Sequence, residues 1–179
     1  MAHEAPDLTS GRAVAVAARW TALAVTAGAF VAVLVGWLSG GGSIDRPWAP
    51  TLDLRLSFEL DGLGVLYSLL ATGSGFAVVA YSARYLPLHL EHQRRPAGDE
   101  ARFHALIVLF MVSMVGLATA QDLILLFVFW DLTAVASYLL IGFDRQEADA
   151  RDSALMALLV TGITAVLLLV AAMMLAHHT

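Results

Sequence analysis

Residues 123–143 read LILLFVFWDLTAVASYLLIGF, and this stretch decides the fold. A helix needs about 20 predominantly apolar residues to cross the hydrocarbon core of a bilayer, and this stretch is long enough. Asp131 is its one charged residue. The length is too great for a buried helix in a small soluble domain, so the stretch predicts a transmembrane helix.

Four more stretches have the same length and apolar character. The one nearest the amino end carries Arg19, but its apolar part is too long for a secretory signal peptide. We therefore predict an all-α integral membrane protein with about five transmembrane helices in a single membrane domain, residues 1–179. Loops are predicted at Gly40–Gly42 and Pro87–Glu100. The predicted spans are residues 13–38, 62–83, 103–121, 123–143 and 153–176.

The composition agrees with this class and excludes several others. Apolar residues make up 59% of the chain and charged residues 14%, whereas a soluble domain carries about a quarter charged residues. The formal net charge of −5 offers no basic surface for nucleic acid. The long apolar stretches make the lipid bilayer the expected partner. The sequence has no cysteine and no motif for a phosphate loop, a zinc site or a nucleophilic triad. We therefore expect no cofactor, no metal and no covalent catalysis.

The segment that connects the first two spans has a different pattern of apolar residues. From Leu52 to Asp61 apolar and polar residues alternate, which is the pattern of a β-strand with one apolar face. Such a strand cannot lie in lipid with its backbone unpaired, so we expect it at the membrane surface, packed on its own helices or on a neighbour. Pro47 and Pro50 mark the expected turn before it, and Asp61 is placed to cap the next helix.

The arginines predict the orientation, because short cytoplasmic loops carry an excess of positive charge. The amino end and the loops after the second and fourth spans share one side of the membrane. We therefore expect the amino end on the cytoplasmic side of the cell membrane, and the strand, the turn at Asp122 and the carboxyl end outside. The arginines expected inside are Arg12, Arg19, Arg84, Arg94, Arg95, Arg102, Arg145 and Arg151, against Arg46 and Arg55 outside.

Asp131 is the residue that most needs an explanation. It follows Leu123 by eight residues, or about 12 Å along a helix, which places it near the middle of the bilayer. A carboxylate there costs about 2.5–3.5 kcal/mol on insertion scales, so it either takes up a proton near the working pH or pairs with a cation. Both behaviours suit a transport path. The alternative is a protonated aspartate that hydrogen-bonds a neighbouring helix as a packing residue.

The chain offers no cation at that depth. It contains no lysine, and Arg19, Arg84 and His104 lie toward the cytoplasmic ends of their predicted helices. We therefore expect the partner of Asp131 to come from a missing part of the polypeptide, from another subunit or from ordered water.

Four other polar residues are weaker candidates for the same path. Thr133 and Ser137 flank Asp131, but such hydroxyls commonly bond back to their own helix or across a helix contact. Asp122 is placed to cap a helix in the turn between two spans, with an ion ligand as the alternative. His104 is placed to pass protons at the cytoplasmic mouth, with an ordinary interfacial histidine as the alternative.

Several motifs resemble those of antiporter-like subunits, above all the A subunit of multisubunit Mrp-type sodium/proton antiporters. The segment FVFWDLTAVASYLLIG, from Phe127 to Gly142, is similar to the Trp-Glu-Leu-Thr helix of that family. FELDGLGVL from Phe58, YSARYL from Tyr81 and LLVTG ending at Gly162 resemble the neighbouring segments. The resemblance covers about residues 48–176. The membrane-arm subunits of respiratory complex I and of related hydrogenases are the sister group.

The resemblance implies a role for Asp131. In the family the carboxylate after the tryptophan lies on the proton path and pairs with a lysine of a later helix. Asp131 stands at that position, with Asp where Glu is usual. A lysine that some relatives carry in the next helix corresponds to Met156 here. Family members have many more spans, so the resemblance implies the amino-terminal part of a larger subunit, or a split subunit that a partner completes.

The implied function is a part of a monovalent cation (sodium)/proton antiporter complex, with Asp131 on the proton path. Its implied partners are the other subunits of that complex, and sodium ions and protons are the transported species. One alternative is a proton-pumping membrane-arm subunit of an NADH-quinone oxidoreductase or related hydrogenase complex. The other is a non-transporting scaffold or truncated subunit, in which Asp131 only packs.

Overall fold

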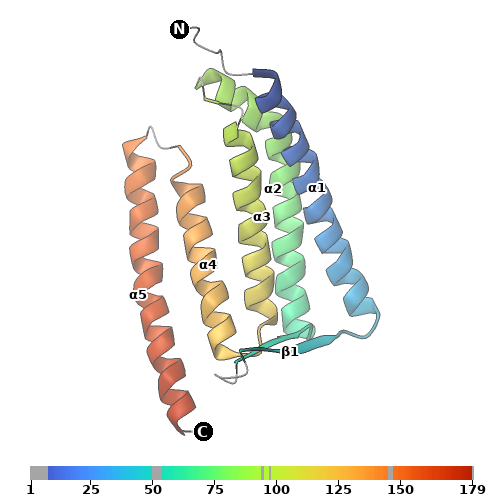
Figure 1. Ribbon diagram of the computed structural model, residues 1–179, viewed down its shortest axis with the longest axis vertical. Coiled ribbons are helices and arrows are strands. Elements are labelled where there is room, and N and C mark those ends of the chain that lie inside the picture. The colour runs from blue at the N-terminus through green and yellow to red at the C-terminus, as the bar shows by residue number, and fades with distance from the viewer. Residues whose placement is uncertain (1–7, 50–53, 94, 97, 145–146, 179) are drawn as a thin grey trace.

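The computed structural model describes residues 8–49, 54–93, 95–96, 98–144 and 147–178. Within them, five helices are long and apolar enough to cross a membrane, and a two-stranded sheet lies between the first two (Figure 1). The predicted all-α membrane fold with a short strand segment is thereby confirmed. The elements are α1 Leu8–Leu38, β1 Ser43–Ala49, β2 Leu54–Glu59, α2 Gly62–His92, α3 Gly98–Thr119, α4 Leu123–Ile141 and α5 Ala148–His178.

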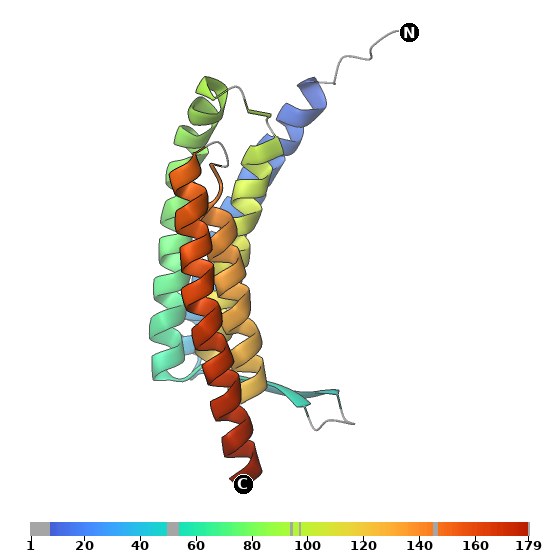
Figure 2. The same ribbon diagram turned by 90° about the vertical axis from the view of Figure 1, so that its left-hand side faces the viewer.

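Each helix runs antiparallel to the next one along the chain (Figure 1). Helices α1, α2 and α3 pack against one another, α4 packs on α3, and α5 packs on α4 at the edge of the molecule. The sheet lies at the end of the bundle where α2 and α4 begin, as Figure 2 also shows. We call this the hairpin end. The opposite end, where α1, α3 and α5 begin, carries Arg12, Arg95 and Arg151, and we call it the arginine-rich end.

The predicted loop at Pro87–Glu100 is wrong at both of its ends. Helix α2 continues through Pro87 to His92, and α3 already begins at Gly98. Leu86 and Leu90 explain the longer α2, because both are buried in a cluster with Phe143, which follows α4. Their burial favours the helix although proline removes one backbone N–H.

The predicted strand is one half of a hairpin. Strand β2 lies inside the predicted residues 52–61, of which Leu52 and Asp53 lie outside the described residues. It pairs antiparallel with β1, a strand that we did not predict, because Ser43–Ala49 lacks the alternating pattern. Pro47, predicted to mark a turn, lies within β1. A proline is tolerated there because both strands are edge strands and the register shifts just after it.

Backbone hydrogen bonds join the hairpin to the turn between α3 and α4 and close the base of the hairpin. Gln121, in the turn between α3 and α4, donates its N–H to the carbonyl of Ser57 at 2.9 Å. Leu60 donates to the carbonyl of Gly42, also at 2.9 Å. The strand thus packs on its own helices, one of the two arrangements expected. At the exposed part of the hairpin, a side-chain hydrogen bond from Arg55 lowers the pKa of Asp45.

The three-helix interface of α1, α2 and α3 contains small and polar residues. Thr26, Ser68, Thr72 and Ser113 are all fully buried, at 0% exposure. The two threonines and Ser113 donate to carbonyls one turn earlier in their own helices, as buried hydroxyls in membrane helices often do. Small residues let helices approach closely in lipid, so this interface is built for close contact.

Candidate functional site

Asp131 lies in the middle of α4, eight residues after Leu123 and ten before Ile141. Its neighbours on the same helix face are spaced three and four residues apart, the spacing of a packing stripe. We call this face the α4 stripe, and it comprises Ile124, Val128, Asp131 and Val135. Its three apolar side chains are 44%, 44% and 45% exposed, so the described part of the chain leaves the stripe uncovered.

Two polar groups in the middle of α4, the Asp131 carboxylate and the Trp130 indole N–H, have no partners within the described residues. Neither a hydrogen bond nor an ion pair joins the Asp131 carboxylate to any of them. The indole N–H of the adjacent Trp130 is buried and likewise has no acceptor there. Ionisable residues in membrane helices almost always face a bundle interior or a water-filled cavity. The Asp131 carboxylate is thus half-buried, on an apolar stripe that the described residues leave partly exposed.

Two of the weaker candidates have local structural roles. Asp122 is the N-cap of α4, where its carboxylate accepts from the N–H groups of Ile124 at 2.8 Å and Leu125 at 3.1 Å. Thr133 donates to the carbonyl of Trp130 at 2.7 Å, on its own helix. Asp61 caps α2 in the same way, as predicted, by accepting from the N–H of Gly64.

His104 is buried between three helices, at 1% exposure, rather than lying on an exposed interface. Its Nδ1 lies 2.9 Å from the Glu100 carbonyl oxygen, and its Nε2 lies 3.3 Å from the hydroxyl of Ser82 on α2. The Glu100 carboxylate in turn pairs with Arg19 of α1, with 2.7 Å between Nη2 and Oε1. Sequence reasoning did not connect these residues, because they come from three separate helices.

Among the described residues, no hydrogen bond joins any two of the five predicted site residues. Asp131, Thr133 and Ser137 share α4, Asp122 stands at its start, and His104 bonds to other elements. Ser137 is half-buried. The described residues also contain no group of three or more His, Asp or Glu side chains that is arranged to hold a metal ion. Asp131 is the one Asp, Glu, His, Lys or Arg residue of α4, and it lies in the middle of that helix.

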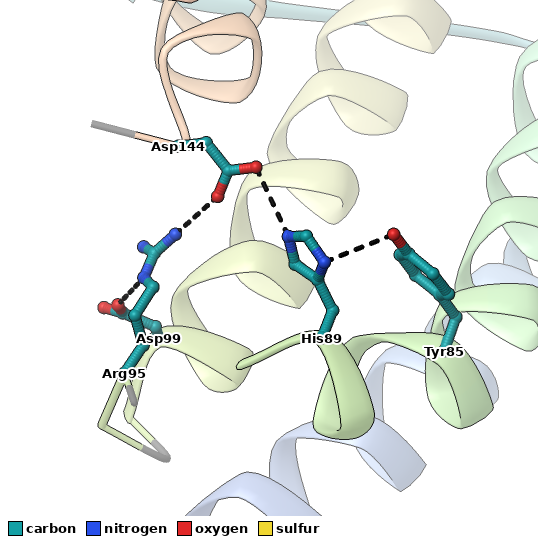
Figure 3. Close-up of polar contacts among 5 residues, drawn as sticks. All are labelled: Tyr85, His89, Arg95, Asp99 and Asp144. Atoms are coloured by element: carbon teal, nitrogen blue, oxygen red, sulfur yellow. Dashed lines mark hydrogen bonds and ion pairs between the residues drawn. The ribbon is translucent and has the colours of Figure 1, made fainter. Parts of the chain in front are cut away.

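A second polar network closes the arginine-rich end (Figure 3). Arg95, between α2 and α3, donates to Asp99 and to Asp144 at 2.7 Å each. Asp144 also lies 3.3 Å from Nε2 of His89, whose Nδ1 lies 3.2 Å from the hydroxyl of Tyr85. This network ties the α2–α3 connection to the α4–α5 connection. Sequence reasoning missed it, because its members are charged loop and helix-end residues that resemble solvated ones.

Comparisons with known proteins agree with this fold. Residues 120–179 match a family described as NADH:quinone oxidoreductase/Mrp antiporter, TM. A curated candidate antiporter subunit of Staphylococcus saprophyticus, mnhA2, is 40% identical over 119 residues, which is 66% of this chain and 14% of that protein. The protein of the same name from Staphylococcus aureus strain JH9 is 35% identical over 133 residues, 74% of this chain and 16% of its own length.

A solved structure extends the similarity to the fold. The structure of the Mrp complex from Dietzia sp. DQ12-45-1b contains a chain that this protein matches with a TM-score of 0.71 and 30% identity. The match covers 92% of this chain and 19% of that one, so the chain spans under a fifth of the length of the relatives it matches. The sequence, the helix arrangement and these matches together show that the chain is an antiporter-like protein similar to the A-type subunit of Mrp antiporters.

Proposed function

We propose that the chain is part of a monovalent cation/proton antiporter and supplies Asp131 as a carboxylate on the proton path. The observation that carries the proposal is the position of this carboxylate, in the middle of α4 on an apolar stripe that the described residues leave uncovered. An ionisable residue at that depth is a functional candidate by default. The similarity to the A-type subunit of Mrp antiporters supports the same assignment.

The element that covers the α4 stripe is proposed to carry a cation at the depth of Asp131. The chain has no lysine, and Arg19 is engaged by Glu100 near the arginine-rich end. A basic residue from another part of the subunit or from a partner subunit would form an ion pair with the Asp131 carboxylate. A pair of this kind can hold and release a proton as its partner moves. The other subunits of a multisubunit complex are the proposed partners, and sodium is the proposed exchanged ion.

The first test replaces Asp131 in the assembled complex. We expect Asp131→Asn to reduce sodium/proton exchange at least tenfold, because the amide cannot take up a proton, while assembly of the complex is unchanged. Exchange is measured in everted membrane vesicles as the change in internal pH on addition of sodium. Asp131→Glu should retain exchange, because it keeps the carboxylate.

The control uses a carboxylate with a structural role. Asp122→Asn keeps a capping side chain at the start of α4, so exchange should persist. Wild-type exchange in Asp131→Asn would refute the transport role. It would support the scaffold alternative, in which Asp131→Leu impairs only the yield and thermal stability of the complex.

The family description also covers NADH:quinone oxidoreductase, so redox-driven proton pumping is the second candidate. The two differ in their driving force. Exchange that proceeds in vesicles without any electron donor supports the antiporter, and exchange that stops when electron transfer is inhibited supports the redox-driven complex.

A further inference from the structure

We propose that His104, Ser82 and the Arg19–Glu100 pair form a second proton-binding site, inside the α1–α2–α3 interface and separate from Asp131. The histidine, the serine and Glu100 are 1%, 4% and 4% exposed, so three polar groups from two helices are buried together. Arg19 adds a third helix to the site through its ion pair with Glu100. Buried polar groups need partners, and here each of them has one.

The contacts fix which ring nitrogen of His104 carries a proton when the ring is neutral. The Glu100 carbonyl oxygen can only accept a hydrogen bond, so Nδ1, 2.9 Å away, is the N–H donor. Nε2 is then the atom that gains or loses a proton. It faces the Ser82 hydroxyl at 3.3 Å, and a hydroxyl both donates and accepts.

Ser82 can satisfy Nε2 in both protonation states. In the neutral ring, the Ser82 O–H donates to Nε2. When Nε2 takes up a proton, its N–H donates to the Ser82 oxygen, and the hydroxyl turns to donate to the carbonyl of Val79, which lies 3.1 Å away. No buried donor is left unpaired in either state, so the site can bind and release a proton by reversing one hydrogen bond.

The charged groups around the ring belong to its own helix and to α1. Burial of the ring opposes its positive form, Glu100 favours it and Arg19 opposes it, while α2 contributes the uncharged hydroxyl of Ser82. Arg19 and Glu100 also line a cavity of about 450 Å³ at the arginine-rich end, together with Arg12 and Glu91. This cavity brings the site's ion pair within reach of protons from that end of the bundle.

The proposed site goes beyond the role of Asp131 and does not require it. His104 lies on α3 about 9 Å from the first residue of that helix, toward the arginine-rich end, whereas Asp131 is in the middle of α4. The protonation of His104 can be measured directly, without any transport. Failure of the antiporter assignment and failure of this site are therefore separate outcomes.

The test is nitrogen NMR of the complex in lipid bilayers, with histidine rings labelled with ¹⁵N. The His104 signals are identified by their loss in His104→Gln. The pH is lowered from about 8 to about 5, the range in which ordinary histidines change charge, and we expect Nδ1 to stay protonated throughout and Nε2 to gain its proton as the pH falls. A ring that keeps one protonation state across this range, or one that is protonated on Nε2 instead of Nδ1 when neutral, would overturn the proposal.

Two serine variants test the hydrogen bond. Ser82→Ala removes the hydroxyl that donates to the neutral ring, so the Nε2 signal of His104 should shift. Ser113→Ala is the matched control, because this buried serine of α3 donates to the Leu109 carbonyl and not to the ring. Equal effects of the two variants on the His104 signals would also contradict the proposed site.

Discussion

Gly116 sets how closely α3 and α4 approach each other. A Cβ atom at this position would lie 2.3 Å from the ring of Phe129 on α4, well inside van der Waals contact. That ring also packs edge-on against Phe58 of the hairpin, with 5.8 Å between ring centroids. The missing side chain of one residue therefore lets an aromatic ring join α3, α4 and β2.

We expect Gly116→Ala to destabilise the protein by about 1–3 kcal/mol, because the added methyl group forces apart a packed interface. The measurement is thermal unfolding of the complex in detergent. Gly28→Ala on α1 is the matched control, since nothing lies within 4 Å of its Cβ position. That change should be neutral or slightly stabilising, because alanine favours a helix over glycine. A Gly116→Ala variant as stable as wild type would show that the ring moves aside freely.

At the scale of elements, the arginine-rich end is held by ion pairs between connections. The Arg95 side chain is 9% exposed, pairs with two carboxylates and lies 4.4 Å over the ring of Phe143 (Figure 3 shows the polar part). Helix α5 packs mainly on α4, so the position of both depends on how the α4–α5 connection is fixed. The Arg95–Asp144 pair supplies that link to α2 and α3.

A double-mutant cycle of Arg95→Met and Asp144→Asn tests this link. We expect a coupling free energy of about 0.5–3 kcal/mol, because the two groups are in direct contact and partly shielded from water. The measurement is the thermal stability of the four proteins in detergent at low salt. Arg102→Met, at the same end of α3, is the control, and it should not couple to Asp144→Asn. Additive effects of the Arg95 and Asp144 changes on thermal stability would contradict the proposed link between the two connections.

At the scale of the whole molecule, the α2–α3 connection and the α4–α5 connection lie at the same end of the bundle, opposite the hairpin (Figure 1). Six of the eight arginines that predict a cytoplasmic side belong to the described residues at that end, while Arg94 and Arg145 lie outside the described residues. The fold therefore keeps the sequence-based charge asymmetry, and the proposed cytoplasmic amino end becomes directly testable.

The chain has no cysteine, so single cysteines report its orientation. Ser43 at the hairpin end and Glu91 at the arginine-rich end are both exposed. We expect a membrane-impermeant maleimide to label Ser43→Cys in intact cells and Glu91→Cys only after the membrane is opened, because positive charge stays inside. The reverse labelling pattern would invert the proposed orientation, and a cysteine-free wild type provides the background.

The sequence alone determined the five long apolar helices, the strand pattern of β2, the caps at Asp61 and Asp122 and the position of Asp131 in the middle of its helix. These features follow from transfer into hydrocarbon, from side-chain periodicity and from local hydrogen bonds, all of which act on residues that are neighbours in the chain. A sequence pattern therefore contains the information they need.

Only the tertiary structure decided which distant residues meet. It paired β1 with β2 where no alternation predicted a strand, and it extended α2 past Pro87 because Leu86 and Leu90 find a buried cluster. It joined His104 to Ser82 and left the α4 stripe uncovered. The physical reason is that each of these features depends on the packing of several helices at once, and no single helix carries that packing in its own sequence.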